Sequence, residues 1–199
     1  MNIVIIKYNA GNIESVNNAL NRLGVNAEIT ADHDKIRKAD KVIFPGVGEA
    51  STTMDYLREH GLDKLIKTLE QPVLGICLGL QLMCSHSEEN DTECLGIFDE
   101  KVKRFQPHPG EEFVTKVPHM GWNALSEING DLFPEKMKNE FVYFVHSYYA
   151  GLGEHTAAVT NYIVPFSAAL QKDNFYATQF HPEKSGTVGA EILNNFLKL

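Results

Sequence analysis

The residue best placed to do chemistry in this chain is Cys77, where an apolar run from Pro72 stops between two glycines, Gly75 and Gly79. This G-x-C-x-G pattern is the thiol counterpart of the G-x-S-x-G nucleophile elbow, in which a sharp strand-to-helix turn lifts the reactive atom above a sheet. At so tight a turn, a side chain at either glycine would collide with a neighbouring strand or helix. Residues 80–84 continue as a helix, whose N-terminus favours thiolate. We therefore interpret Cys77 as a nucleophile rather than as a buried structural cysteine.

A cysteine nucleophile needs a base and a group that orients the base. His181 follows the alternating run Phe175–Phe180 and precedes Pro182, so it lies where a strand ends, as catalytic groups do in open α/β sheets. Glu183, two residues on, is within reach of the imidazole and would hold its tautomer. Another six histidines lie in polar or loop contexts and are predicted to be solvated or capping residues: His33, His60, His86, His108, His119 and His155.

The oxyanion of an acyl-transfer intermediate needs backbone N–H donors. We expect one from Leu78 and one from the loop Gly46–Gly48, where glycine permits close backbone approach. That loop does not fit a dinucleotide site, because Ser51 stands where G-x-G-x-x-G requires its third glycine. Cys84, His86 and Cys94 lack a known zinc spacing. The sequence therefore predicts acyl transfer through a thioester, with no metal and no cofactor.

The elements that must position these groups alternate between strand and helix over the first 85 residues. Strands are predicted at residues 2–7, 25–30, 41–44 and 72–76, and helices at 13–23, 32–39, 50–60 and 62–70. Residues 85–100 are acidic and are predicted to be loop. Further strands are expected at Phe141–Val145, Thr156–Tyr162, Phe166–Gln171 and Phe175–Phe180, before a last helix at Thr187–Leu199. This pattern predicts one α/β domain over residues 1–199, with an open, mostly parallel sheet flanked by helices and a mixed or antiparallel C-terminal extension.

Composition limits the partners. Among the 199 residues, 43% are hydrophobic and 22% charged, which is typical of a soluble globular protein. The net charge of −8, without a long Lys/Arg cluster, argues against nucleic acid or an anionic membrane surface. No apolar segment approaches the roughly 20 residues of a membrane span, and Met1–Lys7 is predicted to be a strand rather than a signal peptide. With only three cysteines, we expect a protein of the reducing cytoplasm.

Four blocks of the chain, in order, resemble those of the class I glutamine amidotransferases. They are Pro45–Gly48, Gly75–Gln81, His146–Tyr148 and Gln179–Ser185. Two further segments, Asn9–Asn12 and Pro118–Asn123, are similar to the glutaminase subunits of imidazole glycerol phosphate synthase, from histidine biosynthesis. The resemblance covers essentially the whole chain. One departure is Lys7–Ala10, which stands where many members carry an Asp-Tyr-Gly-type turn.

The resemblance implies catalytic roles for the matching residues. Cys77 would attack the side-chain amide of glutamine, with His181 as general base and then acid and with Glu183 as its orienter. The N–H groups of Val47 and Leu78 would stabilise the oxyanion.

The resemblance also implies binding roles. The α-amino end of glutamine would be held by Gln81 and Glu89, and its carboxylate by the stretch Ser147–Tyr148. His146 would be positional rather than catalytic.

The resemblance further implies a partner, a (βα)8-barrel cyclase that forms a heterodimer with this chain and receives the ammonia. The cyclase would combine it with a phosphoribulosyl aminoimidazole-carboxamide intermediate to give imidazole glycerol phosphate and aminoimidazole carboxamide ribotide. Asn12, Met120 and Trp122 would lie on the docking face near the ammonia route. Three alternatives stay open: the glutaminase subunit of another ammonia-channelling amidotransferase, a non-catalytic docking subunit, and a cysteine peptidase.

Overall fold

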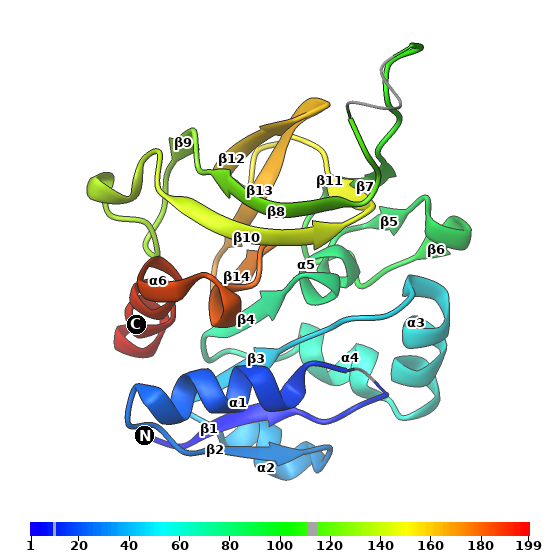
Figure 1. Cartoon of the computed structure of the whole chain (residues 1–199). Helices are drawn as coiled ribbons and strands as arrows, with labels where there is room; N and C mark the ends of the chain where they lie inside the picture. The colour runs from blue at the N-terminus through cyan, green and yellow to red at the C-terminus, as the bar shows by residue number, and fades with distance from the viewer. Residues whose placement is uncertain (10, 111–114) are drawn as a thin grey trace.

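The computed structural model describes residues 1–9, 11–110 and 115–199 (Figure 1). Its first half alternates strands and helices, as predicted. Ala10, which belongs to the compared segments Lys7–Ala10 and Asn9–Asn12, lies outside the described residues. The elements of this half are β1 (Ile3–Ile6), α1 (Ile13–Arg22), β2 (Ala27–Thr30), α2 (His33–Lys38), β3 (Lys41–Phe44), α3 (Ala50–Glu59), α4 (Leu62–Lys67), β4 (Val73–Ile76) and α5 (Leu78–Met83).

The second half is mostly strands and ends in a helix. Its elements are β5 (His86–Ser87), η1 (Glu89–Asp91), β6 (Thr92–Glu93), β7 (Lys101–Arg104), β8 (His119–Ala124), β9 (Glu127–Ile128), η2 (Glu135–Met137), β10 (Phe141–His146), β11 (Tyr148–Ala150), β12 (Thr156–Tyr162), β13 (Val164–Lys172), β14 (Phe175–Thr178), η3 (Pro182–Lys184) and α6 (Gly186–Lys198).

The main sheet has the strand order β2-β1-β3-β4-β14-β13-β11-β7-β5-β6. Its strands from β2 to β14 are parallel, and β13, β11 and β7 continue it with antiparallel pairs. This confirms the predicted parallel sheet with a mixed extension. Because β14 lies beside β4 in parallel, the two strands end at the same edge, which brings Cys77 and His181 together across about a hundred residues of sequence.

Two of the predicted details are wrong. Phe141–Val145 does not extend the main sheet, because β10 pairs with β8 in a separate antiparallel ribbon (Figure 1). Residues 85–100 are not entirely loop, because β5 and β6 form a small hairpin around η1. Strands of two residues are too short to produce a visible alternation of polar and apolar side chains.

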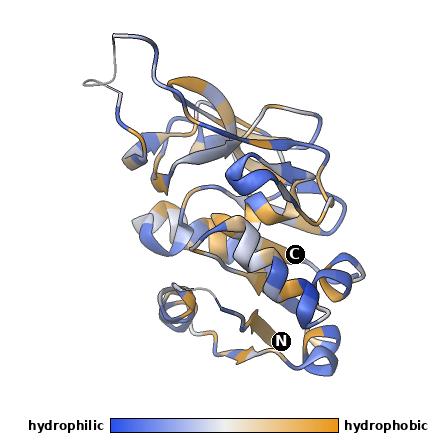
Figure 2. Ribbon diagram, turned by 90° about the vertical axis from the view of Figure 1, so that its right-hand side faces the viewer, coloured by the Kyte–Doolittle hydropathy of each residue, from blue (hydrophilic) through white to orange (hydrophobic). Residues whose placement is uncertain are grey.

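Apolar side chains cover both faces of the main sheet. In β1, Ile3 and Ile5 pack with α1 and α6, whereas Val4 and Ile6 pack with α2, α3 and α4. Such alternation follows from the two-residue repeat of a strand. Figure 2 shows helices that mix polar and apolar segments, as expected of helices with one face on a sheet. No described helix is long and apolar enough to cross a bilayer.

Candidate active site

Cys77 lies at the turn from β4 into α5 with φ of 54° and ψ of −104°, a strained backbone for a residue other than glycine. Its N–H donates to the carbonyl of Thr178 at 2.7 Å, which fastens the turn to the end of β14. A Cβ at Gly79 would collide with the carbonyl oxygen of Phe44, and one at Gly75 would lie 2.9 Å from the Met83 sulfur. The predicted steric reason for both glycines is therefore confirmed.

His181 and Glu183 form a buried pair at the end of β14. Nδ1 of His181 lies 2.7 Å from Oε1 of Glu183, and neither side chain is exposed. Since a carboxylate accepts, Nδ1 carries a hydrogen, and in the neutral ring Nε2 is the bare nitrogen. In the described part of the chain, this buried Nε2 has no hydrogen-bond partner. It is therefore available to take a proton.

The environment of His181 favours its protonated form. Burial lowers the pKa of His181, but the interactions with the Cys77 thiolate and with Glu183 outweigh burial and raise this pKa to about 10. A thiolate–imidazolium pair is the reactive form of a cysteine nucleophile.

Asn12 contacts the same carboxylate. Asn12 directly precedes α1, but its side chain makes no cap hydrogen bond. Instead Nδ2 donates to Oε1 of Glu183 at 2.5 Å and lies 3.4 Å from Nδ1 of His181. Asn12 has φ of 72°, the left-handed conformation that asparagine tolerates. The residue expected on the docking face is thus also in direct contact with the buried His–Glu pair.

A hollow of about 300 Å³ opens beside the sulfur. It brings together the predicted nucleophile, oxyanion and substrate residues, and its lining is Val47, Gly48, Cys77, Leu78, Gln81, Glu89, Pro118, Val145, His146, Ser147 and Tyr148. Among the predicted oxyanion residues, Gly46 lies beside this lining. The hollow has the size of a small-ligand site.

Two polar residues of this hollow, Gln81 and Glu89, form hydrogen bonds with other residues of the chain. Gln81 is buried, and its Nε2 donates to the carbonyl of Tyr148 at 2.9 Å and to Oε1 of Gln179 at 3.0 Å. Glu89 is half-buried, and one carboxylate oxygen accepts the N–H of Ala50 at 2.8 Å. The other carboxylate oxygen could receive an ammonium group. Burial raises the pKa of this carboxyl group.

The predicted oxyanion donors are not arranged as an open hole. The N–H of Leu78 donates to the carbonyl of Gly46 at 3.2 Å, so this donor is occupied by the protein's own backbone. Gly46 is closely surrounded, since a Cβ there would lie 2.5 Å from the Tyr8 hydroxyl oxygen and 2.9 Å from Cβ of Leu78. The neighbouring Gly48 has φ of 140°, a conformation reserved for glycine.

Sequence reasoning missed two polar residues near the sulfur, Gln179 and Tyr8, and one behind the wall of the hollow, His119. Gln179 is fully buried and directs Nε2 to the Cys77 sulfur at 3.7 Å. Tyr8 donates its hydroxyl to the carbonyl of Pro45, and burial together with Cys77 raises the pKa of Tyr8. His119 is buried, so its predicted solvated or capping role is wrong. The available signal was a polar residue, Gln179, near the end of a predicted strand and shortly before His181.

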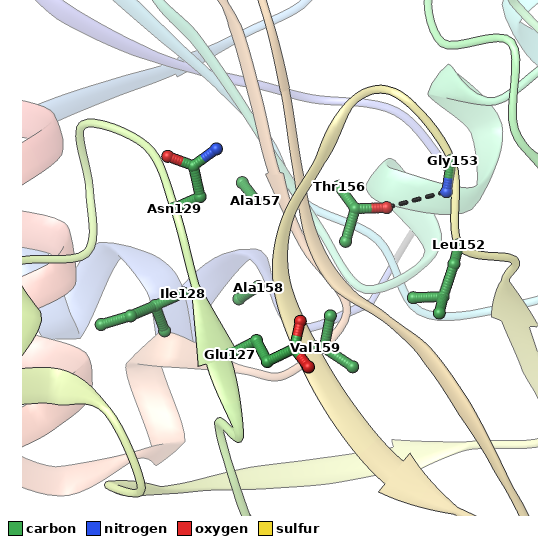
Figure 3. Close-up of a pocket in the computed structure, with 9 residues that line it drawn as sticks. All are labelled: Glu127, Ile128, Asn129, Leu152, Gly153, Thr156, Ala157, Ala158 and Val159. Atoms are coloured by element: carbon green, nitrogen blue, oxygen red, sulfur yellow. Dashed lines mark hydrogen bonds between the residues drawn. The ribbon is translucent and has the colours of Figure 1, made fainter.

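A second hollow of about 350 Å³ shares no residue with the first. It lies along β9 and β12 and next to the turn at Leu152 and Gly153 (Figure 3). Its one ionisable lining residue is Glu127, without a nucleophile or base beside it. Of these two hollows, the one at Cys77 is therefore the candidate for chemistry.

Comparison with known proteins gives the same family along the chain. The glutamine amidotransferase class-I family matches residues 4–199. The imidazole glycerol phosphate synthase subunit HisH of Bacteroides fragilis (strain YCH46) is 64% identical over 199 residues, all of both chains. Subunit HisH of Escherichia coli (strain K12) is 46% identical and is also fully covered.

Solved structures share the fold at lower identity. A glutamine amidotransferase has a TM-score of 0.74 at 19% identity, covering 98% of this chain and 97% of that one. A glutamine amidotransferase from Thermotoga maritima has a TM-score of 0.62 at 15% identity, covering 100% and 83%. The chain belongs to the class-I glutamine amidotransferases, within the group of HisH subunits of imidazole glycerol phosphate synthase.

Proposed function

We propose that this chain, acting as one glutamine amidotransferase type-1 domain over residues 1–199, hydrolyses glutamine to glutamate and ammonia through a thioester on Cys77. The observation that carries the proposal is the strained Cys77 turn at the end of β4, next to the end of β14, where a buried His181–Glu183 pair has an imidazole Nε2 without a hydrogen-bond partner in the described residues. The reaction takes place in the cytoplasm and needs no metal or cofactor.

The residues divide the reaction between them. His181 Nε2 takes the thiol proton, and the Cys77 sulfur attacks the side-chain carbonyl carbon of glutamine. The imidazolium then protonates the amide nitrogen, so that ammonia leaves and a thioester remains. Water attacks the thioester, with its proton passing to His181, and glutamate leaves as the thiolate is restored. Glu183 holds the imidazole tautomer throughout both steps.

Substrate recognition uses both ends of glutamine. Glu89 receives the α-ammonium group with the oxygen that Ala50 does not use, beside Gln81. The segment Ser147–Tyr148 receives the α-carboxylate. A glutamine held at both ends presents its side-chain amide to the sulfur.

The oxyanion hole opens by a backbone rearrangement. Turning the Gly46–Val47 peptide removes the Gly46 carbonyl from the Leu78 N–H and directs the Val47 N–H into the hollow. Gly48, at φ of 140°, gives the loop a position that can absorb such a turn. We expect docking of the partner, loaded with its own ligand, to favour the open arrangement and so to raise glutaminase turnover.

The partner is a (βα)8-barrel cyclase that forms a heterodimer with this chain. Ammonia released into neutral water becomes ammonium, which has no lone pair for attack, so the product must reach the second site without meeting bulk water. Relatives at up to 64% identity bear the name imidazole glycerol phosphate synthase subunit, which supports this pathway. Asn12, Met120 and Trp122 belong to the docking face. The products there are imidazole glycerol phosphate and aminoimidazole carboxamide ribotide.

The test compares the native chain with Cys77→Ala, alone and with the cyclase. The native chain is expected to release glutamate faster with the ligand-loaded cyclase than alone. Cys77→Ala is expected to lose all glutamine-dependent synthesis and to keep synthesis from added ammonium salts. Loss of both activities would indicate a structural role for Cys77, and equal glutamate release with and without the cyclase would contradict the coupling.

A further inference from the structure

A pair of buried imidazoles, of which one lines the Cys77 hollow, lies apart from the His181–Glu183 pair. His119 begins β8 and His146 ends β10, and the two residues are opposite each other in the register of the ribbon. They are only 4% and 6% exposed. Nδ1 of His119 lies 3.1 Å from Nε2 of His146, and His146 lines the hollow.

The partners of this pair fix every ring hydrogen. The carbonyl of Tyr148 can only accept, so Nδ1 of His146, at 2.7 Å from it, carries hydrogen. Neutral His146 then has a bare Nε2, which must accept from Nδ1 of His119. The bare Nε2 of His119 lies 3.3 Å from Nδ2 of Asn123, which donates to it. All the hydrogen bonds therefore point in one direction, from Asn123 to Tyr148.

The surroundings hold both rings neutral and in place. Burial lowers the pKa of His119 to about 4, and burial is also the main cause that lowers the pKa of His146 to about 3. The His119 ring is stacked on Tyr162 at 4.0 Å and on Phe144 at 4.8 Å between ring centres. A ring with stacked neighbours cannot turn easily, so its Nδ1 stays directed at His146.

The carbonyl at the end of this chain of hydrogen bonds also belongs to the sulfur's own network. Tyr148 O accepts Nε2 of Gln81 as well, and that nitrogen also donates to Gln179, whose amide nitrogen points to Cys77. The position of the Ser147–Tyr148 backbone is thus set from two sides. One side is the network at the nucleophile, and the other is His146.

We propose that His119 and His146 are positioning residues for the Ser147–Tyr148 segment, which forms one wall of the hollow. Both imidazoles are neutral with hydrogen on Nδ1, and their hydrogen bonds hold this wall in its substrate-binding position. His119 touches no substrate and acts through His146. The proposal rests on the glutaminase function proposed above. Because the wall binds the carboxylate end of glutamine in the ground state and the transition state alike, its loosening raises KM and leaves kcat nearly unchanged.

Two variants of His119 separate this role from a merely structural one. His119→Phe keeps an aromatic ring for stacking on Tyr162 and Phe144 but has no donor. His119→Asn loses the ring, yet its amide nitrogen is bonded to Cγ as Nδ1 is, so it keeps a donor for His146. Glutaminase kinetics of each are measured in the complex with the cyclase, together with the thermal unfolding midpoint.

We expect His119→Phe to raise KM for glutamine at least about fivefold with kcat within about twofold, since about 1 kcal/mol of uniform binding corresponds to that factor. His119→Asn should be the less stable variant and should keep KM closer to the native value. If KM instead follows the unfolding midpoint, or stays unchanged in His119→Phe, the proposal is overturned.

A spectroscopic measurement tests the arrangement of the two rings without depending on glutaminase activity. Nitrogen-15 spectra of the histidine rings at neutral pH should give His119 and His146 as neutral, with hydrogen on Nδ1. A hydrogen on Nε2 of either ring would overturn the ordered pair. Absence of Cys77-dependent glutamine hydrolysis in the native complex would instead contradict the proposed function, and the ring spectra would still decide the arrangement of the pair.

Discussion

His181 binds its proton more tightly in the folded chain than in the unfolded one. Its pKa rises from 6.5 to about 10 because the interactions with Cys77 and Glu183 outweigh burial. The folded His181 imidazole therefore holds a proton that the unfolded imidazole has lost between these two pH values. The contribution of His181 to stability is fully present below pH 6.5 and is lost as pH rises through about 10.

This linkage can be measured with His181→Asn. The free energy of unfolding, from urea titrations across this pH range, should fall more steeply in the native chain than in the variant. The difference in slope is at most about 1.4 kcal/mol per pH unit, the value for one proton. Cys77→Ala should reduce the slope too, because it removes one of the groups that raise this pKa. Parallel curves for the native chain and both variants would contradict the assignment.

Asn12 stabilises the ionised Glu183 with a charge-assisted hydrogen bond of 2.5 Å. Asn12→Ala should lower kcat/KM for glutamine about tenfold, since a hydrogen bond to a charged group contributes roughly 1.5–3 kcal/mol. The assay uses the isolated chain, where docking cannot contribute. Asn18→Ala, at an exposed position of α1, serves as the control and should keep native kinetics. A loss seen only in the presence of the cyclase would assign Asn12 to the interface alone.

At the scale of elements, the close approach of α5 to β3 depends on Gly79. A Cβ there would overlap the carbonyl oxygen of Phe44, and backbone atoms cannot move aside as a flexible side chain can. Gly79→Ala should therefore lower the free energy of unfolding by about 2 kcal/mol or more, within the range of overpacking. It should also displace the turn that carries Cys77 and so reduce turnover.

The matched control is Gly151→Ala. The nearest atom to a Cβ at this position is the carbonyl oxygen of Lys101 at 3.8 Å, an ordinary contact distance. Urea denaturation should give a change within about 0.5 kcal/mol for this variant. Equal destabilisation by the two substitutions would show that the approach of α5 to β3 is not the cause.

The elements that the sequence predicted well are those with a strong local pattern. The buried run of β4, the strand before His181 and the short helix that starts after Asp32 are all confirmed. β8 was not predicted, because Gly121 and the polar residues of Pro118–Asn123 hide its alternation.

The parts of the site that sequence could not give depend on contacts between distant segments. No local pattern reports that β10 leaves the main sheet for β8, and so none reports that His119 meets His146. No local pattern reports the hydrogen bond from the Leu78 N–H to the Gly46 carbonyl either, because this bond depends on the conformation of a loop. Residue identity indicated the chemistry, but only tertiary structure gives the state of the oxyanion donors.

At the scale of the whole molecule, the β8–β10 ribbon has one buried and one exposed face. His119 and Phe144 face inward, whereas Met120, Trp122 and Phe141 are 64%, 55% and 55% exposed. Large apolar side chains gathered on one ribbon are typical of a surface that another protein covers. The inward face of the same ribbon carries the histidine pair, so the expected docking surface and the wall of the hollow share one element.

Trp122 is the best candidate for the main docking contact, because tryptophan is enriched among the residues that dominate interfaces. Trp122→Ala should weaken binding to the cyclase by about 2 kcal/mol or more, a loss of about thirtyfold in affinity measured by calorimetry. Basal glutaminase activity of the isolated chain should stay unchanged. Leu152→Ala is the control, because Leu152 is also large, apolar and 52% exposed but lies beside the second hollow. Equal affinities of the native chain and Trp122→Ala for the cyclase would contradict the assignment of the docking surface to the β8–β10 ribbon.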